Sequence, residues 1–148
     1  MKTVRSYNLW LIAVVAVILL LIIGKANADE ELYFIGNKNI PENELRKSDI
    51  MNIFLGKQSQ WSDKQTITIC LLQEKVAYNI FTRRYLNKTP MQFNRYWRKM
   101  MFTGKGIMPE PFTSKEELLK FIAETNGAIG YLPSEVNANG VKTISVLH

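Results

Sequence analysis

The chain has 148 residues with a formal charge of +6, 47% apolar residues, one Cys and one His. This length permits one domain, and its content of apolar and aromatic residues excludes wholesale disorder. A single Cys excludes an internal disulfide, and no pair of Cys or His residues has metal-ligand spacing. Disulfide-stapled miniproteins and zinc modules are therefore excluded.

The first 28 residues have the pattern of a secretory signal peptide. Lys2 and Arg5 form a basic start, residues 9–23 are 15 consecutive apolar residues, and Ala26-Asn27-Ala28 is a small-x-small cleavage site. As a helix this run spans about 22 Å, short of the roughly 30 Å hydrocarbon core, so cleavage is favoured over a membrane anchor. We expect residues 1–28 to be a signal peptide and residues 29–148 to be a periplasmic domain without stable membrane insertion.

Cleavage changes the charge of the protein. The first 28 residues carry three cations and no anion, so the mature chain has 16 cations and 13 anions, a charge of +3. An exported domain of this charge is not expected to bind nucleic acid. Eight cations lie between residues 74 and 105, where Glu74 is the one acidic residue. This segment suits an acidic partner, a phosphate or an anionic membrane surface; ordinary solvated helix faces are the alternative.

The first half of the mature chain predicts two strands and two helices. Leu32 to Ile35 reads as a strand closed by a turn at Gly36-Asn37. Ser48 is expected to cap a short helix that ends at Gly56. A polar loop over 57–65 carries Trp61. The β-branched alternation of 66–72 is the clearest strand, and 75–86 follows as an amphipathic helix with Val76 in its apolar stripe.

The second half predicts two capped helices and two strands. Thr89-Pro90-Met91-Gln92 is a capping box, and the helix it opens ends at Gly104-Lys105-Gly106. Its apolar face is expected to hold Phe93, Tyr96, Trp97, Met100 and Met101, and its solvent face Arg95, Arg98 and Lys99. Ser114-Lys115-Glu116-Glu117 opens another helix, closed by Asn126-Gly127. Strands are expected at 128–132 and 141–147. The predicted fold class is α/β, a small mixed sheet with flanking helices.

A set of motifs follows in order along this domain. They are Ile53-Phe54-Leu55-Gly56-Lys57 with Trp61, the 66–72 strand with a helix carrying Phe81 and Leu86, Tyr96-Trp97, Phe102-Thr103-Gly104-Lys105-Gly106, and Asn126-Gly127-Ala128-Ile129-Gly130-Tyr131. The set resembles the phosphate-binding periplasmic proteins of ABC transporters, in particular short single-lobe members. The resemblance covers residue 32 to the C terminus. It implies one lobe of a type 2 periplasmic-binding-protein-like fold, a transport-related role and no cofactor. Each motif also has a purely structural explanation, such as a helix cap or a loop anchor.

The chain departs from this family at the turn after the 66–72 strand. Phosphate-binding relatives place a Ser/Gly/Thr-rich turn there, whose hydroxyl and backbone N–H groups hold the anion. This chain has Gln73-Glu74-Lys75 instead, and the Glu74 carboxylate repels an anion. About 120 residues also supply one lobe, which leaves a site open to water.

Two binding functions remain open. The first is weak capture of phosphate or another small anion, with Lys75, Arg83, Arg84 and Lys105 as the candidate cations. The second is a protein-interaction or sensory module that has lost solute binding. Its basic face of Arg95, Arg98 and Lys99 would meet an envelope transporter or sensor protein.

An enzyme is not expected. His148 is the C-terminal residue and a poor general base. Cys70 lies in a predicted strand and reads as a buried apolar residue. Capping explains the adjacent Glu116 and Glu117.

Overall fold

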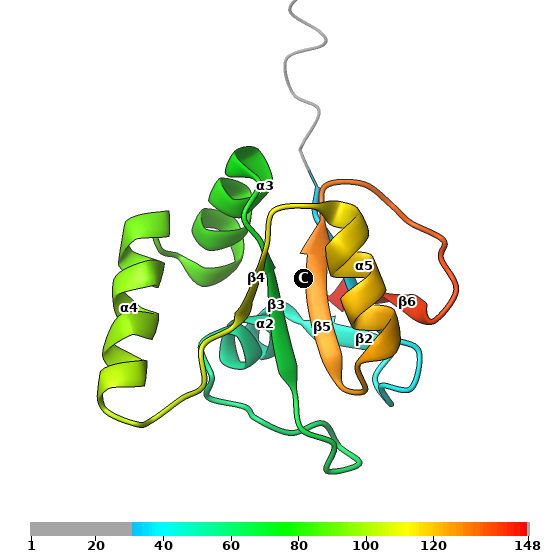
Figure 1. Cartoon of the computed structure of the whole chain (residues 1–148), viewed down its shortest axis with the longest axis horizontal. Helices are drawn as coiled ribbons and strands as arrows, with labels where there is room; N and C mark the ends of the chain where they lie inside the picture. Colours follow the sequence, from blue (N-terminus) through cyan, green and yellow to red (C-terminus); the bar gives the residue numbers. More distant parts are fainter. Residues whose placement is uncertain (1–30, 148) are drawn as a thin grey trace, which may run out of the picture. The chain divides into compact units, whose positions relative to one another are not determined.

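The computed structural model describes residues 31–147, which form a six-stranded mixed sheet with helices on both of its faces (Figure 1). The strands are β1 Tyr33–Asn37, β2 Glu44–Arg46, β3 Thr68–Leu72, β4 Glu110–Phe112, β5 Ala128–Leu132 and β6 Val141–Leu147. The helices are α2 Lys47–Phe54, α3 Lys75–Ile80, the π-helix η1 Phe81–Tyr85, α4 Pro90–Phe102 and α5 Lys115–Glu124. The predicted signal peptide lies outside the described residues.

The sheet has the strand order β2-β6-β1-β5-β3-β4. β1 is antiparallel to both β5 and β6, whereas β3 is parallel to β5 and to β4, and β2 is parallel to β6. The sheet is therefore mixed, as the sequence predicted. Within residues 31–147, no helix is long and apolar enough to cross a bilayer.

Two adjacent residues of β5 show which helices cover each face of the sheet. A Cβ at Gly130 would lie 3.0 Å from Cδ1 of Ile122, which belongs to α5. The next residue, Tyr131, stacks on Phe81 of η1 at a ring-centroid distance of 4.1 Å. Successive side chains of a strand point to opposite faces, so α5 covers one face and η1 the other.

The core of the described residues is rich in aromatic side chains on the η1 face. Phe54 of α2 meets Phe81 edge-on at 4.8 Å, and Phe34 of β1 meets Tyr85 at 4.9 Å. These rings and Tyr131 are at most 3% exposed. Residues 31–147 thus have a hydrophobic core of their own, consistent with a domain of this size that folds independently.

The structure corrects the predicted cap of α2 and the predicted end of β1. Gly36 and Asn37 continue β1 and do not form a turn. Nδ2 of buried Asn37 donates to the carbonyls of Ile122 (2.8 Å) and Ala123 (3.1 Å), groups that the C-terminal end of α5 leaves without helical partners. In α2 the carboxylate of Asp49 accepts from the Arg46 N–H at 3.0 Å, so capping comes from Asp49 and not from Ser48.

Two short strands, β2 and β4, were not predicted. Both have three residues and both are edge strands. Glu44 and Arg46 flank one buried residue in β2, and Pro111 occupies the middle of β4, where it removes a backbone donor. Such residues protect sheet edges from further pairing, and they also hide a strand from pattern analysis.

The predicted helix over 75–86 is present, but its second half is a π-helix. Buried Thr82 donates through Oγ1 to the carbonyls of Tyr78 (3.0 Å) and Asn79 (3.3 Å). The structure also corrects the apolar stripe, because Val76 is 50% exposed. Ala77, Phe81 and Tyr85 are buried and form the apolar face of this segment.

The α4 prediction is confirmed in its caps and its two faces. Thr89 Oγ1 accepts from the Gln92 N–H, and the Gln92 side chain accepts from the Thr89 N–H. Phe93 and Trp97 are buried, whereas the basic side chains Arg95, Arg98 and Lys99 are exposed. Met101 is a correction: it is 44% exposed.

We predict that replacing Trp97 by Ala lowers the free energy of unfolding by about 3 to 5 kcal/mol, because the change leaves a cavity in the core. It also removes the Nε1 donor to the Phe54 carbonyl at 3.1 Å. Arg98→Ala, on the exposed face of the same helix, should change stability by about 0.5 kcal/mol or less. Urea unfolding of both variants measures this, and the opposite ranking contradicts the observed orientation of α4.

Candidate functional site

The turn between β3 and α3 is the place where the sequence departs from the phosphate-binding family that it resembles. Glu74 is the N-cap of α3, and its Oε1 accepts from the Val76 N–H at 3.3 Å. The preceding Gln73 N–H donates to the Phe112 carbonyl of β4 at 2.8 Å. The backbone donors of this turn therefore bind acceptors within the protein, and a carboxylate lies at the positive, N-terminal end of the helix.

A buried tyrosine holds this turn against the sheet. The hydroxyl of Tyr131 donates to the Leu72 carbonyl, at the end of β3, over 2.7 Å. Burial is the main cause that raises the pKa of Tyr131 well above its ordinary value, and the charges of Tyr78 and Glu74 add to it. The hydroxyl consequently remains a hydrogen-bond donor at any physiological pH.

The four cations predicted to contact an anion lie in two separate regions. Lys75 begins α3, and Arg83 and Arg84 lie in η1; all three are exposed. Arg83 Nε donates to Oδ1 of Asn79 at 2.8 Å. Lys105 follows the C-terminal end of α4, a helix of 13 residues that is about 20 Å long. It lies at the opposite end of α4 from η1, so the structure does not gather these side chains around one small ion (Figure 1).

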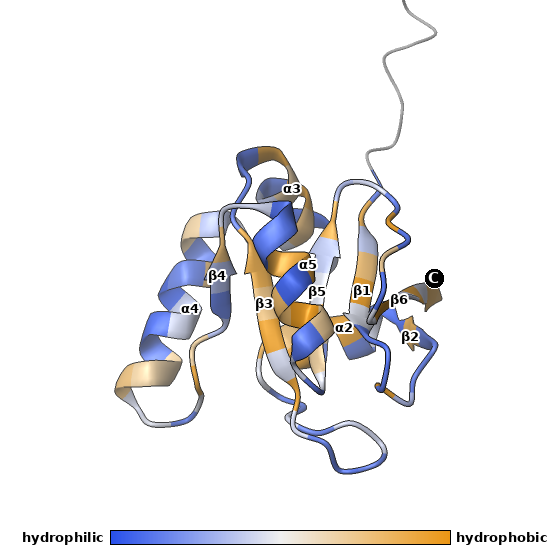
Figure 2. Cartoon of the chain, turned by 45° about the vertical axis from the view of Figure 1, so that its right-hand side comes forward, coloured by the Kyte–Doolittle hydropathy of each residue, from blue (hydrophilic) through white to orange (hydrophobic). Residues whose placement is uncertain are grey.

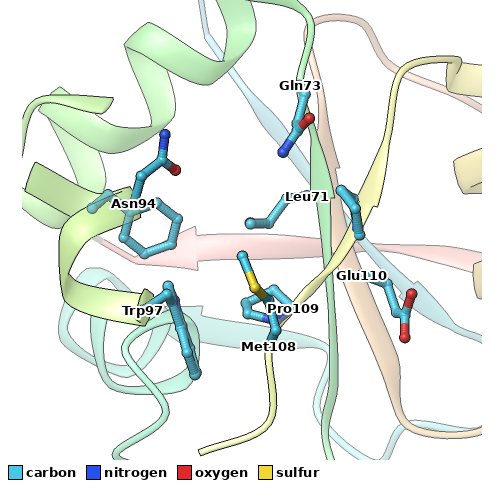
Figure 3. Close-up of a pocket in the computed structure, with 9 residues that line it drawn as sticks. Leu71, Gln73, Asn94, Trp97, Met108, Pro109 and Glu110 are labelled. Carbon is cyan, nitrogen blue, oxygen red and sulfur yellow. The ribbon is translucent and has the colours of Figure 1, made fainter. Parts of the chain in front are cut away.

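A small pocket lies between α4 and the edge of the sheet, with a volume of about 220 Å³ (Figure 3). Its lining is mainly apolar, with Leu71, Phe93, Trp97, Met108, Pro109 and Pro111, and its polar side chains are Gln73, Asn94 and Glu110. None of the four predicted cations lines it. It is smaller than the roughly 300 to 1,000 Å³ of typical ligand pockets, so it suits an apolar group of the size of one side chain.

Sequence reasoning missed this pocket because β4, a strand that was not predicted, forms one of its walls.

The exposed surface of α4 carries a second hollow of about 480 Å³, lined by Met91, Asn94, Arg95 and Arg98. Here the two arginines belong to the basic face that the sequence singled out. The sequence therefore indicated the arginines of this hollow. It did not indicate the pocket, because the pocket forms only when β3 pairs with β4.

Among the residues considered for catalysis, Cys70, Glu116 and Glu117 have structural roles. Cys70 is buried, and burial, followed by the charge of Glu110, raises its thiol pKa to about 12. Ser114 Oγ accepts from the Glu117 N–H and donates to Glu116 at 2.8 Å, a bond that lowers the pKa of the Glu116 carboxyl. His148 lies outside the described residues, among which no cluster of His, Cys, Asp and Glu could hold a metal ion.

No family model matches the sequence, and no curated protein matches it. Solved structures do. One is a putative phosphate ABC transporter substrate-binding protein with bound phosphate from Clostridium perfringens, with a TM-score of 0.60 and 14% identity. Another is PstS from Borrelia burgdorferi, with a TM-score of 0.56 and 16% identity. The alignments cover 78% of this chain, and 44% and 46% of those chains.

These similarities define the class of fold. The chain has the α/β fold of phosphate ABC transporter substrate-binding proteins, which confirms the predicted fold class. It spans less than half the length of the structures it matches. At such identity the similarity concerns the fold alone, since one fold serves many functions. The neighbours are transporter binding proteins and not enzymes.

We predict that Cys70 is inert in the folded protein. A thiol reagent at about pH 8 should label it only after denaturation, because reaction needs an exposed thiolate. The pKa is raised from 9.0 to about 12 on folding, so the thiol's contribution to stability is complete below pH 9 and is lost between pH 9 and 12. Unfolding of the wild type and Cys70→Ala across this range measures the difference; rapid labelling of the native protein contradicts the prediction.

Proposed function

We propose that this chain is an exported, non-catalytic binding module that recognises an anionic partner in the cell envelope through α4 and does not hold free phosphate tightly. The observation that supports this most directly is the Glu74 carboxylate at the start of α3, bonded to the Val76 N–H. A phosphate at that turn would meet a negative charge in place of open donors. A substrate-binding lobe has thus kept its fold and lost the feature that suits it to a small anion.

The surface of α4 offers the alternative mode of recognition. Arg95, Arg98 and Lys99 are exposed together, and no acidic residue occurs between Lys75 and Pro109. Positive surfaces of this kind select and orient anionic partners. A transporter or sensor protein of the envelope, expected from the family resemblance, is one such partner.

A second candidate function is weak binding of phosphate or another small anion. It rests on the exposure of Lys75, Arg83 and Lys105, and Arg84 is exposed as well. Because three of these cations lie on α3 and η1 and Lys105 lies beyond the C-terminal end of α4, they would act as separate weak contacts.

Export belongs to this proposal, with residues 1–28 as a cleaved signal peptide. We predict that the protein recovered from the periplasm of the exporting cell begins at Asp29, because cleavage follows Ala26-Asn27-Ala28. Intact-mass measurement checks this. A membrane-bound product that retains residues 1–28 contradicts both the cleavage site and the periplasmic location.

We predict that calorimetric titration finds phosphate binding no tighter than about 1 mM, which corresponds to about −4 kcal/mol. Replacing Gln73-Glu74-Lys75 by Ser-Gly-Thr should strengthen binding about tenfold, because hydroxyl and backbone donors are restored at the helix start. Glu74→Gln is the matched control, since it removes the charge without adding those donors. Sub-micromolar binding by the unmodified protein, with a stoichiometry near one, would make solute capture the primary function and refute the proposal.

A further inference from the structure

The end of α4 and the loop that follows it expose a group of large apolar side chains. This α4 tip consists of Met101, Phe102 and Ile107, of which Phe102 is 84% and Ile107 90% exposed. Figure 2 shows apolar colouring over the last turn of α4, at the outer end of the domain. Single exposed apolar residues are ordinary, but a group of three on one protruding tip indicates an interaction surface.

Backbone hydrogen bonds and a contact with Trp97 fix the loop that follows α4. The Lys105 N–H donates to the Met100 carbonyl and the Gly104 N–H to the Met101 carbonyl, both at 3.0 Å. Gly104 has a φ of +64°, which reverses the chain beyond the helix. At Gly106 a Cβ would lie 2.9 Å from the Trp97 ring, so the backbone rests on that buried side chain. These contacts turn Ile107 outward in a defined loop.

Four cations lie near the tip, three of them at increasing distances behind it along α4. Along the helix axis, Lys99, Arg98 and Arg95 lie about 4.5, 6 and 10 Å behind Phe102, and Lys105 lies in the loop itself. All four are exposed. No acidic residue occurs in the sequence from Lys75 to Pro109, and the first that follows is Glu110.

The apolar tip with cations behind it matches an anionic lipid surface, in which the phosphates lie above an apolar interior. Amphipathic elements that lie in a bilayer interface bury their apolar side chains about 5 to 10 Å below the headgroups. Cations at those distances behind the tip reach the level of the lipid phosphates, and an anionic leaflet attracts them. A fluid bilayer also accommodates a convex tip without a preformed pocket.

We propose that the α4 tip inserts into the interfacial region of an anionic membrane, with Arg95, Arg98, Lys99 and Lys105 on the lipid phosphates. This inference rests on the proposed function and names the chemistry of its anionic partner. Binding is peripheral and reversible, because only one short tip enters the interface.

The test measures co-sedimentation of residues 29–148 with vesicles of phosphatidylcholine containing about one-third phosphatidylglycerol. We expect binding to these vesicles, little binding to pure phosphatidylcholine, and at least tenfold weaker binding when salt rises from about 0.1 M to about 0.5 M. Phe102→Ser and Ile107→Ser should each weaken binding about tenfold, because each removes a buried apolar side chain from the complex. Lys99→Glu with Lys105→Glu should abolish it.

Two variants serve as matched controls. Val76→Ser removes an exposed apolar side chain on α3, and Lys120→Glu reverses an exposed charge on α5. Each should change vesicle binding less than twofold. Circular dichroism confirms that all variants are folded before they are compared.

Phe102→Trp reports insertion directly. Trp61 and Trp97 are buried, so a blue shift of the added emission on vesicles, with quenching by brominated lipid, places residue 102 in the bilayer. Inorganic phosphate at constant ionic strength should not displace the protein, which separates a lipid surface from a free-phosphate site.

Failure to bind anionic vesicles overturns the inference and leaves a protein as the partner of α4. Equal loss in the control variants, or binding without a shift in the emission of the introduced tryptophan, overturns insertion of the tip as well. The phosphate titration is independent of these outcomes, so failure of this inference and failure of the proposed function are distinguishable.

Discussion

The stacking of Tyr131 on Phe81 is the contact on which the geometry of the whole domain depends. The two rings lie 4.1 Å apart at 15°, and the Tyr131 hydroxyl donates to the Leu72 carbonyl. One side chain of β5 therefore secures η1 to the sheet and fixes the end of β3, from which the turn to α3 begins. Phe34 and Phe54 complete this cluster and join β1 and α2 to it. Because aromatic packing and a buried hydrogen bond act on the same residue, the turn has little freedom to open toward a ligand.

This constraint makes the two ends of the domain differ in the groups that they expose. At the β3–α3 turn, Glu74 and the bond from Gln73 to Phe112 satisfy donors internally. At the far end of α4, Phe102 and Ile107 project from the domain with cations behind them. In this domain the exposed apolar and cationic side chains therefore lie at the tip of α4. That tip is away from the turn where phosphate-binding proteins of this fold are expected to hold their anion.

The position of α4 is fixed by its hydrogen bonds to the C-terminal end of α2. Trp97 Nε1 donates to the Phe54 carbonyl and the Tyr96 hydroxyl to the Leu55 carbonyl, so two α4 side chains satisfy acceptors at the C-terminal end of α2. Gly56, with a φ of +68°, passes so close to the Trp97 ring that a Cβ there would lie 2.8 Å from it. These contacts hold the middle of α4. In its last turn Met100 is half-buried against the core, whereas Met101 and Phe102 are exposed.

The sequence by itself determined the elements whose signals are local. The alternation before Leu72, the caps at Thr89 and Ser114, and the 3.6-residue period of α4 all predicted what the structure contains, because each depends on neighbouring residues in the chain. The tertiary structure decided the remainder. β2 and β4 exist only because β6 and β3 offer them an edge, and Asn37 continues a strand because the end of α5 supplies its acceptors. The period of α4 placed Met101 on the buried face, but burial also needs an opposing surface, and only the packed domain shows where that surface ends.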